Sequence, residues 1–185
     1  GKGHGLLHEI PDQLAVMKSL TKHSSQVIDG EHASSVLQSS FSALFSGRPQ
    51  PVSVEVPVSS WNLEVSDSSA NLVGEADPAP PVDNDLIAKA VKLIADASSP
   101  MIVVGGGAQS HSVDVQRLAN MISAPVLAFR NGQGVMPSDD KLSIGMPVGY
   151  DLWKKVDVVI GLGTRLQSQV MPWGSDDDLK IIHID

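Results

Sequence analysis

The stretch Pro100-Met-Ile-Val-Val-Gly-Gly-Gly-Ala-Gln109 decides the expected fold. Its apolar residues run directly into three consecutive glycines, a pattern typical of a strand buried on both faces of a parallel sheet. Apolar residues then recur at helical spacing up to Ser123: Val113, Val115, Leu118, Met121 and Ile122. A strand, a glycine turn and a helix together offer backbone N–H groups and a helix dipole to an anion. The stretch therefore predicts an α/β fold of the nucleotide-binding type.

The same pattern recurs further along the chain. Val156 to Gly163 is a second apolar run that ends in glycines, and residues 124–129 and 180–184 are expected to form two more strands. Strands that alternate with helices predict parallel strand–helix–strand units with right-handed crossovers. We expect the two glycine-ended strands to be neighbours whose tips face a shared crevice at the carboxyl edge of the sheet.

The first third of the chain is expected to be a smaller α/β unit. Helical spacing favours helices over residues 11–21 and 31–46. Short strands are expected over 25–28 and 51–57, the second because valines alternate strictly along it.

The composition changes after residue 57, where Ser, Asp, Asn, Pro and Ala dominate. Such a segment buries too little apolar surface to order itself. The predicted organisation is a first unit over 1–57, a linker over 58–84 and a Rossmann-like parallel sheet flanked by helices over 85–185. The last part should open with a helix whose core face is made by four residues, Ile87, Ala90, Val91 and Ile94.

Charge and composition narrow the class of partner. The 185 residues include 13 Lys and Arg against 21 Asp and Glu, a net charge of −8 that disfavours nucleic acid as a partner. The absence of cysteine excludes disulfides, thiolate catalysis and cysteine-based zinc sites. No apolar run approaches the roughly 20 residues that span a bilayer, so no membrane association and a cytoplasmic location are expected. A glycine at the start and a strand-like end suggest a piece of a longer polypeptide.

The glycine turn matches the dinucleotide fingerprint only in part. Gly105 and Gly107 supply the first half of G-x-G-x-x-G, but Ser110 replaces the third glycine. Arg130 follows the next strand where NAD-binding folds carry an acid, and an arginine there could bind a phosphate instead. The glycines either form only a tight turn or bind a ligand, and we favour binding because three in a row, Gly106 included, exceed what a turn needs.

Two further positions point to the same crevice. Arg165 follows the second glycine-ended strand and is either an anion ligand or a solvated loop arginine. Gly145 is placed in the preceding loop, where it could line the crevice. The six histidines and Asp176 to Asp178 give no convincing metal site, and no catalytic residue can be assigned.

Taken together, these segments resemble the thiamine-diphosphate-dependent enzymes of the acetolactate synthase and 2-oxo-acid decarboxylase type. The resemblance covers nearly the whole chain and rests on the order and spacing of its motifs: 21–23, 46–57, 101–109, 124–137, 143–146, 157–165 and 181–185. Gln50 departs from the glycine that the family commonly has between two prolines.

The resemblance implies a subunit with pyrimidine-binding, central and pyrophosphate-binding domains. This chain would hold the end of the first domain and most of the second. It implies thiamine diphosphate and Mg²⁺ as cofactors, a small 2-oxo acid as substrate, and carbon–carbon cleavage or ligation by a transferase or lyase. The activating glutamate is expected before Gly1 and the magnesium motif after Asp185, so this piece alone should be catalytically silent. The parent is expected to be a homodimer or homotetramer, because the cofactor lies between subunits.

The resemblance also implies a nucleotide in the central domain. Relatives that carry FAD hold it there, at positions that match Gly105 to Gly107, Gly145, Met146 and Arg165. Other relatives bind ADP or nothing. The rival hypotheses are a stand-alone module that binds NADP, ADP or FAD or acts in regulation, and a purely structural domain whose ligand site has decayed.

Overall fold

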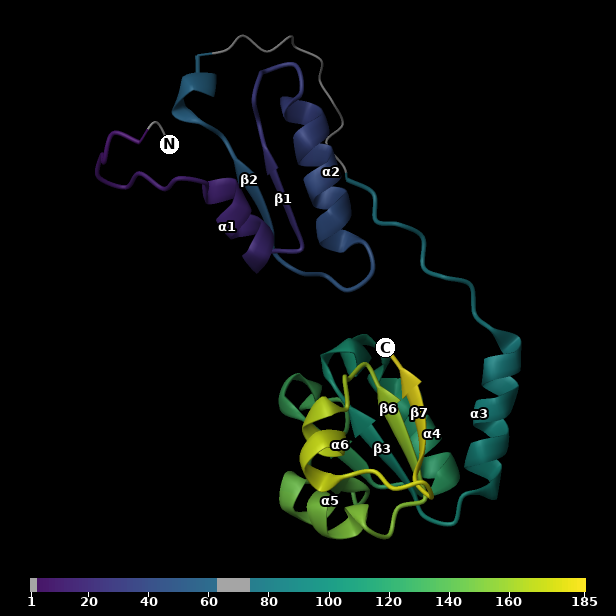
Figure 1. Ribbon diagram of the computed structural model, residues 1–185. Helices are drawn as coiled ribbons and strands as arrows, with labels where there is room; N and C mark the ends of the chain where they lie inside the picture. Colours follow the sequence, from purple (N-terminus) through teal and green to yellow (C-terminus); the bar gives the residue numbers. More distant parts are fainter. Residues whose placement is uncertain (1–2, 63–73) are drawn as a thin grey trace. The chain divides into compact units, whose positions relative to one another are not determined.

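The computed structural model describes residues 3–62 and 74–185, and the chain divides into two compact units, Gly1–Pro81 and Val82–Asp185 (Figure 1). Much of the predicted linker, residues 63–73, lies outside the described residues. At its start, Val58–Ser60 forms a short 3-10 helix, η1. The domain boundaries predicted from composition remain predictions.

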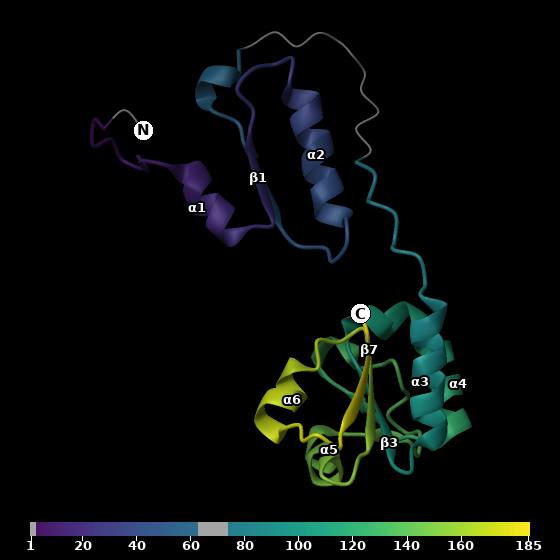
Figure 2. The same cartoon turned by 45° about the vertical axis from the view of Figure 1, so that its right-hand side comes forward.

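The first unit holds a parallel pair of strands, β1 (His23–Gln26) and β2 (Val52–Glu55). Helices α1 (Gln13–Leu20) and α2 (Ala33–Phe45) lie on either side of this pair (Figure 2). Asp12 caps α1 by accepting a hydrogen bond from the backbone N–H of Ala15 at 2.9 Å. The strand expected over 25–28 begins earlier, because pairing with β2 starts at His23. The residues of β1 are all polar, so no apolar pattern indicated where the strand begins.

The second unit is a five-stranded parallel sheet with the strand order β5-β4-β3-β6-β7. The strands are β3 (Pro100–Val104), β4 (Val126–Ala128), β5 (Ser143–Ile144), β6 (Val158–Leu162) and β7 (Lys180–Ile184). The helices are α3 (Asn84–Asp96), α4 (Ser112–Ile122), α5 (Met146–Trp153) and α6 (Gln167–Trp173). Short 3-10 segments, η2 (Gly106–His111) and η3 (Arg130–Gly132), follow β3 and β4. The predicted α/β class is confirmed, and the two glycine-ended strands β3 and β6 are parallel neighbours.

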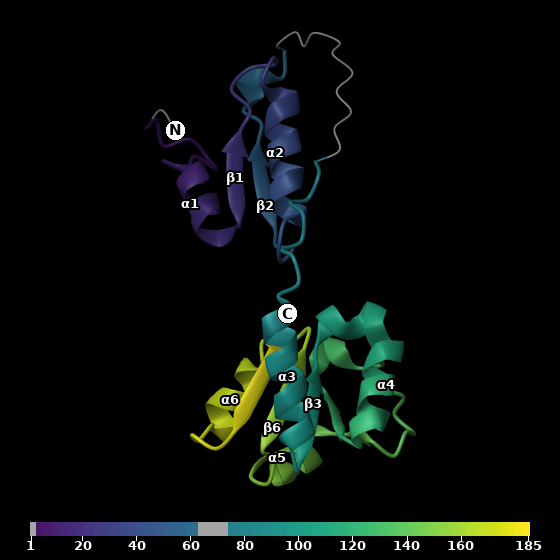
Figure 3. The same ribbon diagram turned by 90° about the vertical axis from the view of Figure 1, so that its right-hand side faces the viewer.

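Alternate residues of the central strands build two cores, one on each face of the sheet. Ile102 and Val104 belong to the core that α3 and α4 cover. Met101 and Val103 belong to the core on the opposite face, which α5 and α6 cover. Figure 3 shows α4 and α6 on opposite sides of the strands. Both faces are buried, which explains the continuous apolar sequence of β3.

The core faces of two helices differ from the prediction. In α3, Ala90 and Ile94 pack on the core, but Ile87 and Val91 are exposed, with 46% and 59% of their surface accessible. In α4, Val115 is buried, whereas Val113 and Met121 are exposed. Each helix contacts the sheet over a narrower strip than its apolar face. The helical spacing therefore predicted that these helices exist, but not which of their apolar residues are buried.

The later elements of this unit differ in part from the expected ones. The loop expected around Gly145 is reduced to that one residue, because Ser143 and Ile144 form β5 and Gly145 is the N-cap of α5. Helix α5 begins directly after Gly145, at Met146. Helix α6 was not predicted, and it packs Trp173 edge-to-face on Trp153, with 5.2 Å between ring centroids.

The Asp157 carboxylate connects two segments at the amino edge of this sheet. Asp157, just before β6, accepts hydrogen bonds from the backbone N–H groups of Ser98 at 2.6 Å and Ser99 at 3.0 Å. Burial tends to raise the pKa of Asp157, but these N–H groups outweigh it and hold the pKa below the usual aspartate range. The side chain thus ties the turn between α3 and β3 to β6.

Across the described residues, no helix is both long and apolar enough to cross a membrane.

Candidate functional site

Each residue predicted to bind a ligand follows the carboxyl end of a strand. Gly105 to Gly107 follow β3, Arg130 follows β4, Gly145 and Met146 follow β5, and Arg165 follows β6. Because the strands are parallel, these ends share one edge of the sheet. The chain order reverses direction between β3 and β6, which is the position where open α/β sheets bind ligands.

At this reversal the loops after β3 and β6 pack backbone against backbone. Gly105 N–H donates to Leu162 C=O at 3.0 Å, and Gly107 N–H donates to Gly163 C=O at 3.1 Å. A Cβ on Gly105 would lie 2.3 Å from the Gly163 oxygen, and one on Gly163 would lie 2.4 Å from the Ala108 nitrogen. We call Gly105, Gly107 and Gly163 the glycine seam. Close packing of the two loops by itself explains why these positions are glycine. That they bind a ligand remains a prediction.

Gly106 and Gly145, the other two glycines predicted to bind a ligand, differ from the seam and from one another. A Cβ on Gly106 would lie 3.1 Å from Asn131 Cβ, which is a tight contact. A Cβ on Gly145 would meet only Pro147 Cδ, at 3.8 Å, and its backbone is extended at φ −88°. No described neighbour therefore requires a glycine at position 145. The predicted direct passage from glycine turn to helix is also corrected, because η2 separates Gly105 from α4.

Two of the predicted residues line one small cavity on the α6 side of the seam. This arginine cavity has a volume of about 180 Å³ and eight lining residues: Phe129, Arg130, Thr164, Arg165, Leu166, Gln167, Ser168 and Gln169. Arg130 and Arg165 are both exposed, and the Arg130 guanidinium lies 5.0 Å from the centre of the Phe129 ring. In residues 3–62 and 74–185, neither guanidinium forms an ion pair with a carboxylate. The cavity is therefore suited to an anion.

The backbone is strained at two positions of the same cavity. Arg130 has φ +46° and Leu166 has φ +53°, in the left-handed region that side chains other than glycine rarely adopt. Such conformations cost energy and concentrate at functional sites. Leu166 is buried at 4% accessibility, so packing holds this turn and thereby fixes the position of Arg165.

Met146 is not a lining residue of the arginine cavity, but it contacts Gln169, which is. Gln169 Nε2 donates to Met146 Sδ at 3.9 Å, and Gln169 is fully buried. Its Oε1 atom has no hydrogen-bond partner among the described residues. Sequence reasoning missed Gln169 because it lies on the short unpredicted helix α6, six residues past the apolar run that ends at Gly163.

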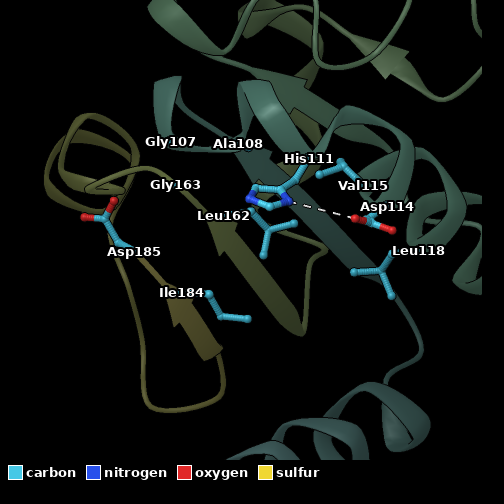
Figure 4. A pocket seen from close by; sticks show the side chains of 10 residues that line it. All are labelled: Gly107, Ala108, His111, Asp114, Val115, Leu118, Leu162, Gly163, Ile184 and Asp185. Atoms are coloured by element: carbon cyan, nitrogen blue, oxygen red, sulfur yellow. Dashed lines mark ion pairs between the residues drawn. The ribbon is translucent and has the colours of Figure 1, made fainter. Parts of the chain in front are cut away.

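A second cavity lies on the α4 side of the seam. This acidic cavity has a volume of about 460 Å³ and an apolar lining that includes Val115, Leu118, Leu162 and Ile184. Figure 4 shows His111 and Asp114 near each other on one side and Asp185 on the other. His111 Nδ1 lies 3.9 Å from Asp114 Oδ2, a long contact between two largely exposed side chains that contributes little to stability.

None of these polar groups was predicted. His111 and Asp114 lie beyond the glycine turn, and Asp185 is the last residue of the strand motif. The acidic run Asp176 to Asp178 forms an exposed turn in which Asp176 Oδ1 accepts a hydrogen bond from the Leu179 N–H at 2.9 Å. Within the described ranges, no three His, Asp or Glu side chains gather as metal ligands would.

Comparison with known proteins connects this geometry to a family. The model of the family described as thiamine pyrophosphate enzyme, central domain, matches residues 87–185. The probable 2-ketoarginine decarboxylase AruI of Pseudomonas aeruginosa is 29% identical over 171 residues, which cover 90% of this chain and 30% of that protein. Acetolactate synthase 1, chloroplastic, of Oryza sativa subsp. japonica is 31% identical over 186 residues, covering 92% of this chain and 28% of that protein.

A third relative matches almost the whole chain. The probable acetolactate synthase large subunit of Methanocaldococcus jannaschii is 30% identical over 203 residues, which cover 99% of this chain and 33% of that protein. The chain thus spans about a third or less of the curated relatives described here. The family match takes in the whole five-stranded sheet and both cavities. This chain belongs to the thiamine pyrophosphate enzyme family, and its residues 87–185 are the central domain.

Proposed function

We propose that this chain is the central domain, with the end of the preceding domain, of a thiamine-diphosphate-dependent enzyme that acts on a 2-oxo acid. The names of its relatives, acetolactate synthase and 2-ketoarginine decarboxylase, support a carboligase or a decarboxylase, hence a transferase or a lyase. Thiamine diphosphate supplies the carbanion-stabilising chemistry of such enzymes. No residue of this chain is assigned to that chemistry, and Mg²⁺ would be held by other parts of the parent.

We propose further that the central domain binds a nucleotide, FAD or ADP, at the carboxyl edge of its sheet. The observation that supports this best is that Arg130 and Arg165, from two different strand ends, line one cavity without a carboxylate partner in the described residues. Guanidinium groups bind phosphate through paired N–H donors, so this cavity fits the diphosphate. Its volume is below the range of roughly 300–1,000 Å³ for drug-sized ligands, so it would hold only one part of a nucleotide.

The acidic cavity fits the remaining part. Its apolar wall suits a base, and carboxylates such as Asp114 and Asp185 can accept hydrogen bonds from ribose hydroxyls. Gly145 would let a ligand approach the backbone at the start of α5, because its missing Cβ leaves open space. The residues of this chain would therefore bind and orient a nucleotide rather than react with it.

Calorimetric titration of the 185-residue chain with ADP, FAD, NAD and NADP tests the nucleotide proposal. ADP or FAD should bind, and Arg130→Ala and Arg165→Ala should each weaken binding. Strong binding of NAD or NADP in preference to ADP and FAD would favour the stand-alone module instead. Binding that is unaffected by either substitution would show that the arginine cavity is not the site.

A turnover assay tests the division of labour within the parent. The isolated chain should form no product from pyruvate with added thiamine diphosphate and Mg²⁺, and measurable product would overturn the assignment.

The parent should form a homodimer or homotetramer, which sedimentation of the full-length enzyme would measure. Its cytoplasmic location also stays a prediction.

A further inference from the structure

A third cavity lies at the amino edge of the five-stranded sheet, opposite the edge that carries the arginine and acidic cavities. Residues from three segments line it: 98–101 at the start of β3, 122–125 between α4 and β4, and 152–156 around the end of α5. We call it the amino-edge cavity. Its volume is about 370 Å³, within the range of roughly 300–1,000 Å³ for small-molecule sites.

The wall of the amino-edge cavity is largely apolar. Its half-buried apolar residues are Pro100, Ile122, Pro125, Leu152 and Val156. Ile122 packs on the core of one sheet face, whereas Leu152 and Val156 pack on the core of the other, so packing fixes their positions while part of their surface stays accessible. A ligand with an apolar chain would be stabilised by removing this surface from water.

The polar residues of the amino-edge cavity offer donors and a positive charge. They are Ser98, Ser99, Ser123 and Lys155, all exposed, and none of the described lining residues is a carboxylate. Within the described part of the chain, the Lys155 ammonium and the three serine hydroxyls form no hydrogen bond or ion pair. An ammonium and a hydroxyl both donate to carboxylate oxygens, so these groups suit an anionic head group.

One side of this cavity is already held in place. The Asp157 carboxylate accepts from the Ser98 and Ser99 N–H groups at 2.6 Å and 3.0 Å, and the Asp157 N–H donates to Ser99 C=O at 3.3 Å. Asp157 is not a lining residue, and both of its carboxylate oxygens already accept hydrogen bonds. The turn that carries the two serines is therefore ordered before a ligand arrives, which lowers the entropic cost of binding.

We propose that the amino-edge cavity binds a short aliphatic carboxylate, with its chain against the apolar wall and its carboxylate on Lys155 and the serine hydroxyls. One ammonium matches one negative charge, whereas a phosphate carries nearly two at neutral pH. No residue lines both this cavity and either cavity at the carboxyl edge, so the inference does not depend on the nucleotide site.

NMR titration of the 185-residue chain with butanoate, hexanoate and hexan-1-ol tests the proposal. Hexanoate should shift the amide signals of Ser99, Ser123 and Lys155 and leave those of Gly105 and Gly107 unchanged. It should bind roughly tenfold more tightly than butanoate, because two more methylene groups are buried. It should also bind about threefold more tightly than hexan-1-ol, the increment of a partly exposed charge pair.

Two neighbouring lysines provide a matched pair of variants. Lys154 is exposed like Lys155 but does not line the amino-edge cavity. Lys155→Met keeps an apolar side chain of similar length, so it should abolish the preference for hexanoate over hexan-1-ol without weakening hexan-1-ol. Lys154→Met changes the net charge equally and should leave the preference intact.

A further probe, 2-oxohexanoate, distinguishes two sources of the carboxylate. Tighter binding than hexanoate would support a 2-oxo acid as the ligand, and equal binding would support a fatty acid. Equal affinities of hexanoate and hexan-1-ol in the wild type, equal effects of the two lysine substitutions, or signals that shift only at the carboxyl edge would overturn the proposal. Such a failure would leave the nucleotide proposal standing, because ADP binding is measured at the other edge.

Discussion

The two cavities at the carboxyl edge share one sheet but differ in charge. The arginine cavity, on the α6 side, is lined by Arg130 and Arg165, and none of its described lining residues is a carboxylate. The acidic cavity, on the α4 side, is lined by Asp114, Asp185 and His111 over an apolar wall, and it has about two and a half times the volume. A phosphate should therefore bind only on the α6 side, while the α4 side accepts an uncharged or hydroxyl-rich group.

The glycine seam separates the two cavities. Gly105, Gly107 and Gly163 bring the loops after β3 and β6 into backbone contact at the point where a ligand crevice would otherwise open. The two cavities therefore have different linings, with Arg130 and Arg165 in one and His111, Asp114 and Asp185 in the other. The first prediction concerns a glycine of this seam.

Gly163→Ala should have the largest effect, because it should disrupt the boundary between the cavities. Position 163 has φ +56°, and an added Cβ would lie 2.4 Å from two backbone atoms that cannot move independently. We expect the free energy of unfolding to fall by about 3 kcal/mol. Urea denaturation followed by the fluorescence of Trp153 and Trp173 would measure it.

Gly134→Ala is the matched control in the same unit. Gly134 also has positive φ, at +93°, but no atom lies within 4 Å of its would-be Cβ. Its substitution should therefore cost only backbone strain, about 1 kcal/mol. Equal losses for the two variants would mean that the seam contacts contribute nothing.

Substitutions of charged residues test directly whether the two cavities differ in their affinity for phosphate, and they should have the next largest effect. Arg165→Ala should weaken ADP binding about 30-fold, because it removes one charge-assisted contact to phosphate. Asp114→Asn, in the acidic cavity, should change ADP affinity by less than about threefold, since a ribose hydroxyl can still donate to an amide oxygen. Calorimetry at fixed ionic strength would measure both. Equal losses would show that the two cavities are not specialised by charge.

Asp157, at the opposite edge of the sheet, supplies a test that should leave both cavities unchanged. Asp157→Ala should lower the free energy of unfolding by about 1 kcal/mol, since two backbone N–H groups lose a partly buried carboxylate acceptor. ADP affinity should stay the same. A loss of affinity comparable to that of Arg165→Ala would mean that the carboxyl edge depends on the amino edge.

The lowered pKa of Asp157 gives this prediction a pH dependence. Because the folded-state pKa lies below the unfolded value, the stabilisation is fully present above about pH 4 and is lost as pH falls through the folded-state pKa. The difference in stability between wild type and Asp157→Ala should therefore shrink at acidic pH. A difference that grows on acidification would contradict the assigned role.

The sequence predicted the parallel sheet and placed Arg130 and Arg165 each just after one of its strands, and the structure adds that both line one cavity. Apolar runs that end in glycine mark parallel strands, and the ends of parallel strands share an edge, so residues just after them must lie near one another. Gln169 could not be predicted in this way, because α6 has seven residues, a proline inside it and no side-chain cap at its start. The left-handed turn at Leu166 that starts it is held by tertiary packing, which no local pattern reveals.

The seam also shows why glycines after a strand mislead when they are assumed to bind ligands. Gly105 and Gly107 match a ligand-binding pattern, yet their missing side chains make room for another backbone. Gly145 matches no fingerprint, yet no described residue needs it to be a glycine. Physical contacts, rather than the motif, separate the two kinds of position.

Gly145→Ala should therefore give the smallest and most specific effect. The backbone at Gly145 is extended and its Cβ would meet only Pro147 Cδ at 3.8 Å, so the free energy of unfolding should change by less than about 0.5 kcal/mol. If a nucleotide approaches the start of α5, the added methyl group should still weaken ADP or FAD binding by about threefold, because the ligand loses close backbone contact. Thermal unfolding and calorimetry on the same sample would separate the two quantities. Unchanged stability with unchanged affinity would place the ligand away from α5, on the seam side of the arginine cavity, and a large loss of stability would mean that Gly145 serves packing as the seam glycines do.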